Sequence, residues 1–134
     1  MIAADTSVVV AAFASWHERH DAANKALVSG TRLIAHCAIE AYSVLTRLPP
    51  PHRAGPDIVR DYLNARFPED YLAIGAAELR SFLNGLPELG ISGGTAYDAM
   101  VGSTAAIAGA TLISLDRRAA RTYERCGVEV SLLG

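Results

Sequence analysis

The chain begins Met1-Ile2-Ala3-Ala4-Asp5-Thr6-Ser7, a short apolar run that ends in an aspartate directly before a helical pattern. The same arrangement returns near the other end, in Thr111-Leu112-Ile113-Ser114-Leu115-Asp116-Arg117. Both stretches indicate a buried strand followed at once by a helix, the unit from which parallel α/β sheets are built. Ligand sites in such sheets form beyond the carboxyl ends of the strands. We therefore expect Asp5 and Asp116 to face one shared pocket.

The rest of the chain continues this alternation. We expect strands at Ile2–Ala4, Arg32–His36, Tyr71–Ile74, Thr111–Leu115 and Val128–Leu132, and helices at Thr6–Phe13, His17–Val28, Ala38–Thr46, Pro56–Phe67, Ala76–Leu86, Ala96–Ala108 and Arg117–Arg125. The pattern predicts an α/β fold with a mostly parallel five-stranded sheet. No internal repeat or linker interrupts it, so residues 1–134 are expected to form a single domain.

Composition limits the classes of function. The formal net charge is −2, which argues against an overall basic nucleic-acid binder. Hydrophobic residues make up 51% of the chain, so some apolar surface is expected to meet a partner. Of the 12 cationic residues only Lys25 is a lysine. The others are arginines, whose forked donors match phosphate oxygens, although GC-rich codon usage also gives this bias.

The sequence also predicts a cytoplasmic protein. Cys37 and Cys126 lie far apart and form no zinc pattern, as expected for a reduced compartment. The N-terminus lacks the basic region of a signal peptide. The uncharged run Ala99–Leu115 has 17 residues and is punctuated by Gly, Ser and Thr, and a spanning helix needs about 20 apolar residues. We interpret it as a buried helix followed by a buried strand, with no membrane contact.

Two further acidic residues complete a candidate site. Glu40 lies near the start of an apolar helix and is the only charged residue between Arg32 and Arg47, while Asp98 interrupts another apolar stretch. Carboxylates gathered in one pocket repel each other unless a cation neutralises them. Ligand sets made only of oxygen favour Mg²⁺ or Mn²⁺. The four acids therefore indicate metal-assisted chemistry on a phosphate.

Each of these acids also has an ordinary structural interpretation. Asp5 and Asp116 could be helix N-caps, and Thr95 with Asp98 resembles a capping box. Glu40 could point into solvent. Capping and metal binding are compatible, because a helix N-terminus favours anions.

Three polar residues beside the acids, Thr6, Ser7 and Ser114, could orient a water or a carboxylate. A plain capping role for them is equally open. His17 and His20 lack a third metal ligand nearby, and the glycine-rich run 90–95 lacks the lysine of a phosphate loop.

At these motifs the chain resembles the PIN domain, the nuclease fold of VapC-type toxins in bacterial toxin–antitoxin pairs. Residues 2–7 resemble the opening strand and first acid of that family, and residues 38–48 with Glu40 resemble its second motif. Residues 97–105 with Asp98 resemble the third motif, and residues 112–117 the closing one.

The resemblance implies a three-layer α/β/α fold and a Mg²⁺- or Mn²⁺-dependent endoribonuclease. It further implies a homodimer, neutralised by a co-expressed antitoxin, in which Asp5 and Asp98 are the core metal ligands and Glu40 and Asp116 support them. The family often has a further acidic or aromatic residue after the closing acid. Here Arg117, Arg118 and Ala119 follow, which leaves the number of metal ions open.

The resulting hypothesis is hydrolysis of an RNA phosphodiester. Arg117, Arg118 and Arg121 would contact flanking phosphates without reading sequence, and a single-stranded or looped RNA is favoured over a duplex. The apolar helix segment Ile39–Leu45 is the expected dimer interface, and an arginine of the antitoxin is expected to enter the acidic pocket.

The sequence argues against three rival interpretations. A receiver domain would need a lysine late in the chain, but none follows Lys25, and a haloacid-dehalogenase-type phosphatase would need an acid where Ser7 stands. A catalytically silent PIN-fold interaction domain is the third, and an RNA cleavage assay separates it from a nuclease. The RNA and the antitoxin are not named by the sequence.

Overall fold

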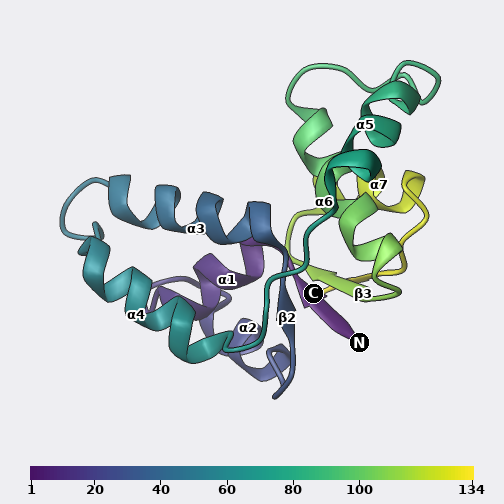
Figure 1. The fold of residues 1–134 in the computed structure, drawn as a ribbon. Coiled ribbons are helices and arrows are strands. Elements are labelled where there is room, and N and C mark those ends of the chain that lie inside the picture. Colours follow the sequence, from purple (N-terminus) through teal and green to yellow (C-terminus); the bar gives the residue numbers. More distant parts are fainter.

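The computed structural model describes residues 1–134 and contains four strands and seven helices. In chain order they are β1 (Ile2–Ala4), α1 (Thr6–Phe13), α2 (His20–Ala26), β2 (Arg32–Leu33), α3 (Ala35–Arg47), α4 (Pro56–Arg66), α5 (Ala76–Gly85), α6 (Thr95–Ile107), β3 (Thr111–Ser114), α7 (Arg117–Arg125) and β4 (Val130–Leu132). The strands form one parallel sheet in the order β2-β1-β3-β4. Figure 1 shows α1 to α4 on one side of the strands and α5 to α7 on the other. The chain therefore has the parallel α/β architecture that the sequence predicted.

The fifth predicted strand, residues 71–74, is reduced to a single parallel bridge between Leu72 and Ile34. One cause is the shortness of β2, which offers two residues for pairing because α3 begins at Ala35. Another is the exposure of Tyr71, which leaves this run with little side-chain packing to hold it against the sheet. The sheet therefore has four strands where the sequence predicted five.

The other predicted elements are present with shifted ends. The helix expected from His17 begins at His20, because hydrogen-bonded turns occupy the residues just before it. The second strand ends at Leu33, and the helix expected from Ala38 already begins at Ala35. The remaining ends match the expectation or differ from it by one or two residues.

Small residues let α1 lie close against the sheet. Ala3 and Ala4 of β1 and Val8 and Ala11 of α1 are fully buried, within a cluster of 25 buried residues. Burying apolar surface contributes about 25 cal/mol for each Å² removed from water. This core anchors β1 and β3, and so it fixes where the residues that follow these strands lie.

The long uncharged run is divided between α6 and β3, with Gly109 at positive φ between them. Glycine adopts this conformation without steric cost, which suits the sharp change of direction. None of the seven helices has the length and hydropathy that crossing a membrane would require.

Candidate active site

Asp5 follows β1 directly and is the N-cap of α1. Only 2% of the residue is exposed. Its Oδ1 accepts hydrogen bonds from the Ser7 hydroxyl at 2.5 Å and the Val8 amide at 3.3 Å, while Oδ2 accepts from the Ser114 hydroxyl at 2.6 Å and the Tyr123 hydroxyl at 2.9 Å. Burial raises the pKa of Asp5, and these four hydrogen bonds oppose the rise by stabilising the carboxylate. Asp5 is therefore a rigidly held, buried acid.

Asp116 is the N-cap of α7, just beyond β3. Its Oδ1 accepts from the backbone amides of Arg118 at 3.0 Å and Ala119 at 3.1 Å. Its own amide donates to the Ser114 hydroxyl at 3.0 Å, the same hydroxyl that donates to Asp5. Ser114 therefore links the two acids that follow β1 and β3.

Asp98 lies in the first turn of α6, but the capping box expected there is not formed. Gly94 is the N-cap, and the Thr95 hydroxyl donates to the Ser92 carbonyl at 2.7 Å. Helix capping through this box therefore does not explain an acid at position 98.

The four acids lie close enough to affect one another's charge. Desolvation raises the pKa of Asp98 first, and the negative charges of Asp116, Glu40 and Asp5 raise it further, while Arg118 opposes them. The four acids singled out by the sequence come from four different segments of the chain and are close enough to interact electrostatically at Asp98.

Glu40 projects from α3 beside His36, with its Oε2 3.5 Å from the imidazole Nε2. Together with Asp116 it lines an open cleft of about 740 Å³. The other residues that line this cleft are Thr6, Ser7, Val10, His17, Glu18, Arg19, Val44, Leu115, Arg117, Arg118 and Gly134. Ten of the thirteen lining residues are thus not hydrophobic, and both acidic and basic side chains are among them.

The side chains of this site fit a hydrated divalent cation. No three Asp, Glu, His or Cys side chains converge on one point closely enough to hold a metal by themselves. Mg²⁺ does not require this, because it usually keeps several waters and binds through one or two carboxylates. The cleft wall also carries the buried Thr6 hydroxyl oxygen, which has no hydrogen-bond partner. All these donors are oxygens, as a hard cation prefers.

The predicted supporting residues behave differently from one another. Ser7 and Ser114 both hydrogen bond to Asp5, as expected of side chains that orient a carboxylate. Arg117 and Arg118 line the cleft, whereas Arg121 is exposed but outside the lining.

The sequence did not predict the contact between Tyr123 and Asp5. It is buried on α7 and donates to Asp5. Burial and then the charge of Asp5 raise its pKa, so the hydroxyl keeps its proton at neutral pH. The available signal was spacing, since Tyr123 lies two helical turns after Asp116 and therefore on the same face of α7. His17 and Arg19 were also missed as cleft residues, because a turn after α1 brings them there.

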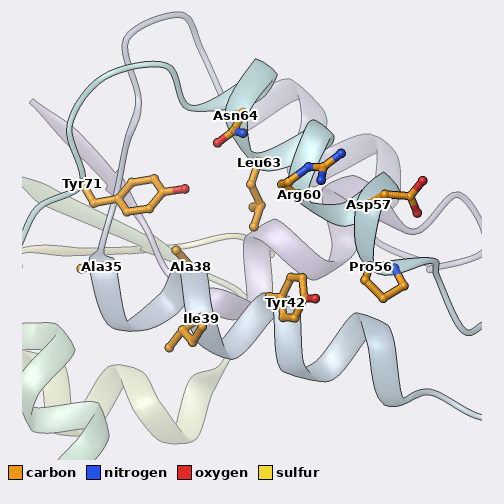
Figure 2. Close-up of a pocket in the computed structure, with 10 residues that line it drawn as sticks. All are labelled: Ala35, Ala38, Ile39, Tyr42, Pro56, Asp57, Arg60, Leu63, Asn64 and Tyr71. Carbon is orange, nitrogen blue, oxygen red and sulfur yellow. The ribbon is translucent and has the colours of Figure 1, made fainter.

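A second, largely apolar pocket of about 520 Å³ lies between α3 and α4. Figure 2 shows Ile39 and Tyr42 on α3 below Leu63 on α4, with Tyr71 at one end. Ile39 is 65% exposed, although it lies in the middle of an apolar stretch. Because Glu40 is the next residue, this α3–α4 groove and the acidic cleft share one helix.

The chain is similar to known proteins over nearly its whole length. The family model described as PIN domain matches residues 2–125. Ribonuclease VapC40 of Mycobacterium tuberculosis, from strains CDC 1551 / Oshkosh and ATCC 25618 / H37Rv, is 55% identical over 133 residues, covering 99% of each chain. Ribonuclease VapC27 of strain ATCC 25618 / H37Rv is 35% identical over 139 residues, covering 96% of this chain and 94% of the relative.

Proposed function

The chain belongs to the PIN-domain family, and from this membership we propose that it is a metal-dependent endoribonuclease, the toxin of a type II toxin–antitoxin pair. The observation that carries the proposal is the gathering of Asp5, Glu40, Asp98 and Asp116 from four separate segments. The relatives named ribonuclease VapC support the reaction class.

We assign the metal to the four acids, with Asp5 and Asp98 as core ligands and Glu40 and Asp116 in support. A bound Mg²⁺ or Mn²⁺ would polarise the scissile phosphate, activate a water and stabilise the leaving oxygen. The protein's own contribution is to hold Asp5 in place through Ser7, Ser114 and Tyr123, whose hydrogen bonds favour the ionised form against the desolvation of this buried acid.

The substrate in this proposal is a single-stranded or looped RNA in the cytoplasm. Arg117 and Arg118 line the cleft and would contact phosphates next to the scissile one, while the exposed Arg121 would reach a more distant phosphate. Such contacts position the strand without reading its sequence. An open cleft suits a flexible strand with splayed bases better than a duplex.

We place the antitoxin on the α3–α4 groove. The groove offers apolar side chains with Asp57 and Arg60 among its lining residues, which suits an amphipathic helical segment. Because α3 also carries Glu40, an arginine on the same segment could enter the acidic cleft and pair with a carboxylate. It would then compete with the metal ion.

We also propose that the protein is a homodimer. Helix α5 has no buried residue, and Leu79 and Leu83 on it are exposed. A helix that buries so little against its own chain is stabilised by packing against a partner. With the groove assigned to the antitoxin, α5 is the better interface candidate. Light scattering should then report about twice the chain mass of 14.2 kDa.

The direct test is RNA cleavage by the purified protein with Mg²⁺ or Mn²⁺ and with a chelator. Chelation should stop cleavage, and Asp98→Asn should reduce the rate about 100-fold or more, because a metal ligand is lost. Asp70→Asn is the matched control, since this acid is exposed and away from the cleft.

Cleavage that persists in chelated Asp98→Asn protein would contradict the mechanism. Absence of cleavage by the wild-type protein on any single-stranded RNA would favour the catalytically silent interaction domain instead.

A further inference from the structure

Two aromatic rings from different helices stack beside the acidic cleft. The imidazole of His36 on α3 and the phenol ring of Tyr97 on α6 have centroids 5.4 Å apart and planes inclined by 11°. Tyr97 is 60% exposed, whereas the His36 side chain is only 23% exposed. The phenol ring therefore has one face covered by the imidazole and presents much of its remaining surface to solvent.

Each of the two stacked residues adjoins one of the proposed catalytic acids, His36 in space and Tyr97 along the chain. His36 Nε2 lies 3.5 Å from Glu40 Oε2 and makes no hydrogen bond, while the imidazole ring stacks on Tyr97. Tyr97 directly precedes Asp98, and Arg118 is near enough to Asp98 to stabilise its charge. The exposed ring of Tyr97 therefore lies close to Glu40, through its stack with His36, and adjoins Asp98 in the chain.

We propose that Tyr97, backed by His36, is the stacking platform for one unpaired nucleobase of the RNA beside the scissile phosphate. This inference rests on the proposed ribonuclease function and adds the residue that positions the strand. Stacking on an exposed aromatic ring accepts any base, because every base has a π face. It therefore complements arginines that hold phosphates without reading sequence.

The surroundings favour a nucleobase over an apolar protein segment. Tyr97 and His36 do not line the apolar α3–α4 groove, and Gly93 to Thr95, which precede Ala96 and Tyr97, are exposed and not hydrophobic. The exposed part of the ring thus lies outside the apolar groove. A nucleobase on a phosphate backbone suits such a site, because the base can stack on the ring while its phosphates meet charged side chains.

The experiment compares wild type, Tyr97→Ala, Tyr97→Phe and His36→Ala in binding and cleaving a single-stranded RNA oligonucleotide with Mn²⁺. Removing the ring should raise KM about 10-fold or more, with a smaller effect on kcat. Tyr97→Phe keeps the ring and should restore wild-type behaviour, and His36→Ala should show an intermediate loss. Tyr71→Ala is the matched control, because this exposed tyrosine lines the α3–α4 groove instead.

A second set of oligonucleotides carries an abasic site at successive positions around the cleavage point. One position should weaken binding to wild type but not to Tyr97→Ala, which gives a coupling between that base and the ring. If each abasic site weakens binding equally in wild type and in Tyr97→Ala, Tyr97 is not the stacking platform. The proposed nuclease function would be unaffected by that result.

If the proposed ribonuclease function is wrong, the wild-type protein will neither bind nor cleave the RNA. That result is distinct from the one above and would overturn the stacking proposal as well. If Tyr97→Ala halves the molecular mass in light scattering and shows no coupling to any base, the ring serves a contact between two copies, and the platform is equally overturned.

Discussion

At the scale of single residues, burial raises the pKa of both Asp5 and Asp98, but different groups surround the two acids. Asp5 accepts hydrogen bonds from three hydroxyls and one amide, all of which favour its ionised form. Asp98 is partly desolvated next to three other acids, with Arg118 as its opposing charge. A bound cation would favour the ionised form of both acids. Pairs of acids held in such different environments are typical of sites that do chemistry.

The surroundings of Asp98 predict how the stability of the fold depends on pH. The pKa of Asp98 is raised above the usual value of an aspartate, so the folded state holds the proton more tightly than the unfolded state. The stabilising effect is complete below the unfolded-state pKa and is lost as pH rises through the raised value. In chelator at neutral pH, Asp98→Asn should therefore melt at a higher temperature than wild type, and the two should converge in acid.

Thermal melts followed by circular dichroism across this pH range provide the measurement. Added Mn²⁺ should raise the melting temperature of wild type more than that of the variant, because the metal binds the folded site. A variant that melts lower than wild type at neutral pH without metal would show that the ionised Asp98 is not under electrostatic stress.

At the scale of helices and strands, the sequence predicted what depends on neighbouring residues. Asp5 and Asp116 were placed correctly after strands, because a short apolar run followed by an acid and a helix is a local pattern. The fifth strand was not obtained, because pairing at residues 71–74 depends on the length of β2, far away in the chain. Tyr123 was missed for a related reason: its contact with Asp5 depends on how α6 and α7 pack.

That packing depends on Gly102, which lies one helical turn after Asp98 on α6. A Cβ atom at this position would lie 3.0 Å from the Cα of Tyr123 and 3.3 Å from the Cβ of Cys126. Gly102→Ala should therefore push α6 and α7 apart, destabilise the fold by about 1–3 kcal/mol, and slow cleavage by shifting Tyr123 away from Asp5.

Gly85→Ala is the control for this prediction. Gly85 ends α5, and no atom lies within 4 Å of where its Cβ would be. Alanine there should be neutral or stabilise the helix by up to about 1 kcal/mol, with cleavage unchanged. Urea unfolding and cleavage rates of both variants provide the test. Equal stability and activity of the two alanine variants would mean that the close approach of α6 and α7 is not required.

At the scale of the whole molecule, α3 separates two surfaces of different chemistry. Glu40 faces the acidic cleft, while Ile39 and Tyr42 line the apolar groove toward α4. Outside its four site acids the chain carries a net positive charge. In the proposed function, RNA is thus recognised in the cleft through phosphate contacts, and the antitoxin in the groove through burial of apolar side chains. An inhibitor seated on the groove would still lie next to Glu40, one of the proposed catalytic acids.

This division predicts that the two functions can be separated by mutation. Ile39→Ser removes an exposed apolar anchor from the groove and should weaken antitoxin binding about 10-fold or more, as for a residue central to an interface. Metal-dependent RNA cleavage should remain, because Ile39 does not line the cleft. Ile58→Ser is the matched control: Ile58 is 56% exposed on α4 but lies outside the groove lining.

Isothermal titration with the co-expressed antitoxin, cleavage assays and light scattering of both variants distinguish the possible outcomes. Loss of antitoxin affinity in Ile39→Ser alone, with unchanged mass, places the antitoxin in the groove. Equal affinity of the two variants would remove the antitoxin from this surface. A change of mass in Ile39→Ser would instead show that two copies of the chain meet through the groove. Inhibition would then have to act from another face, because the apolar surface beside Glu40 would already be buried in the dimer.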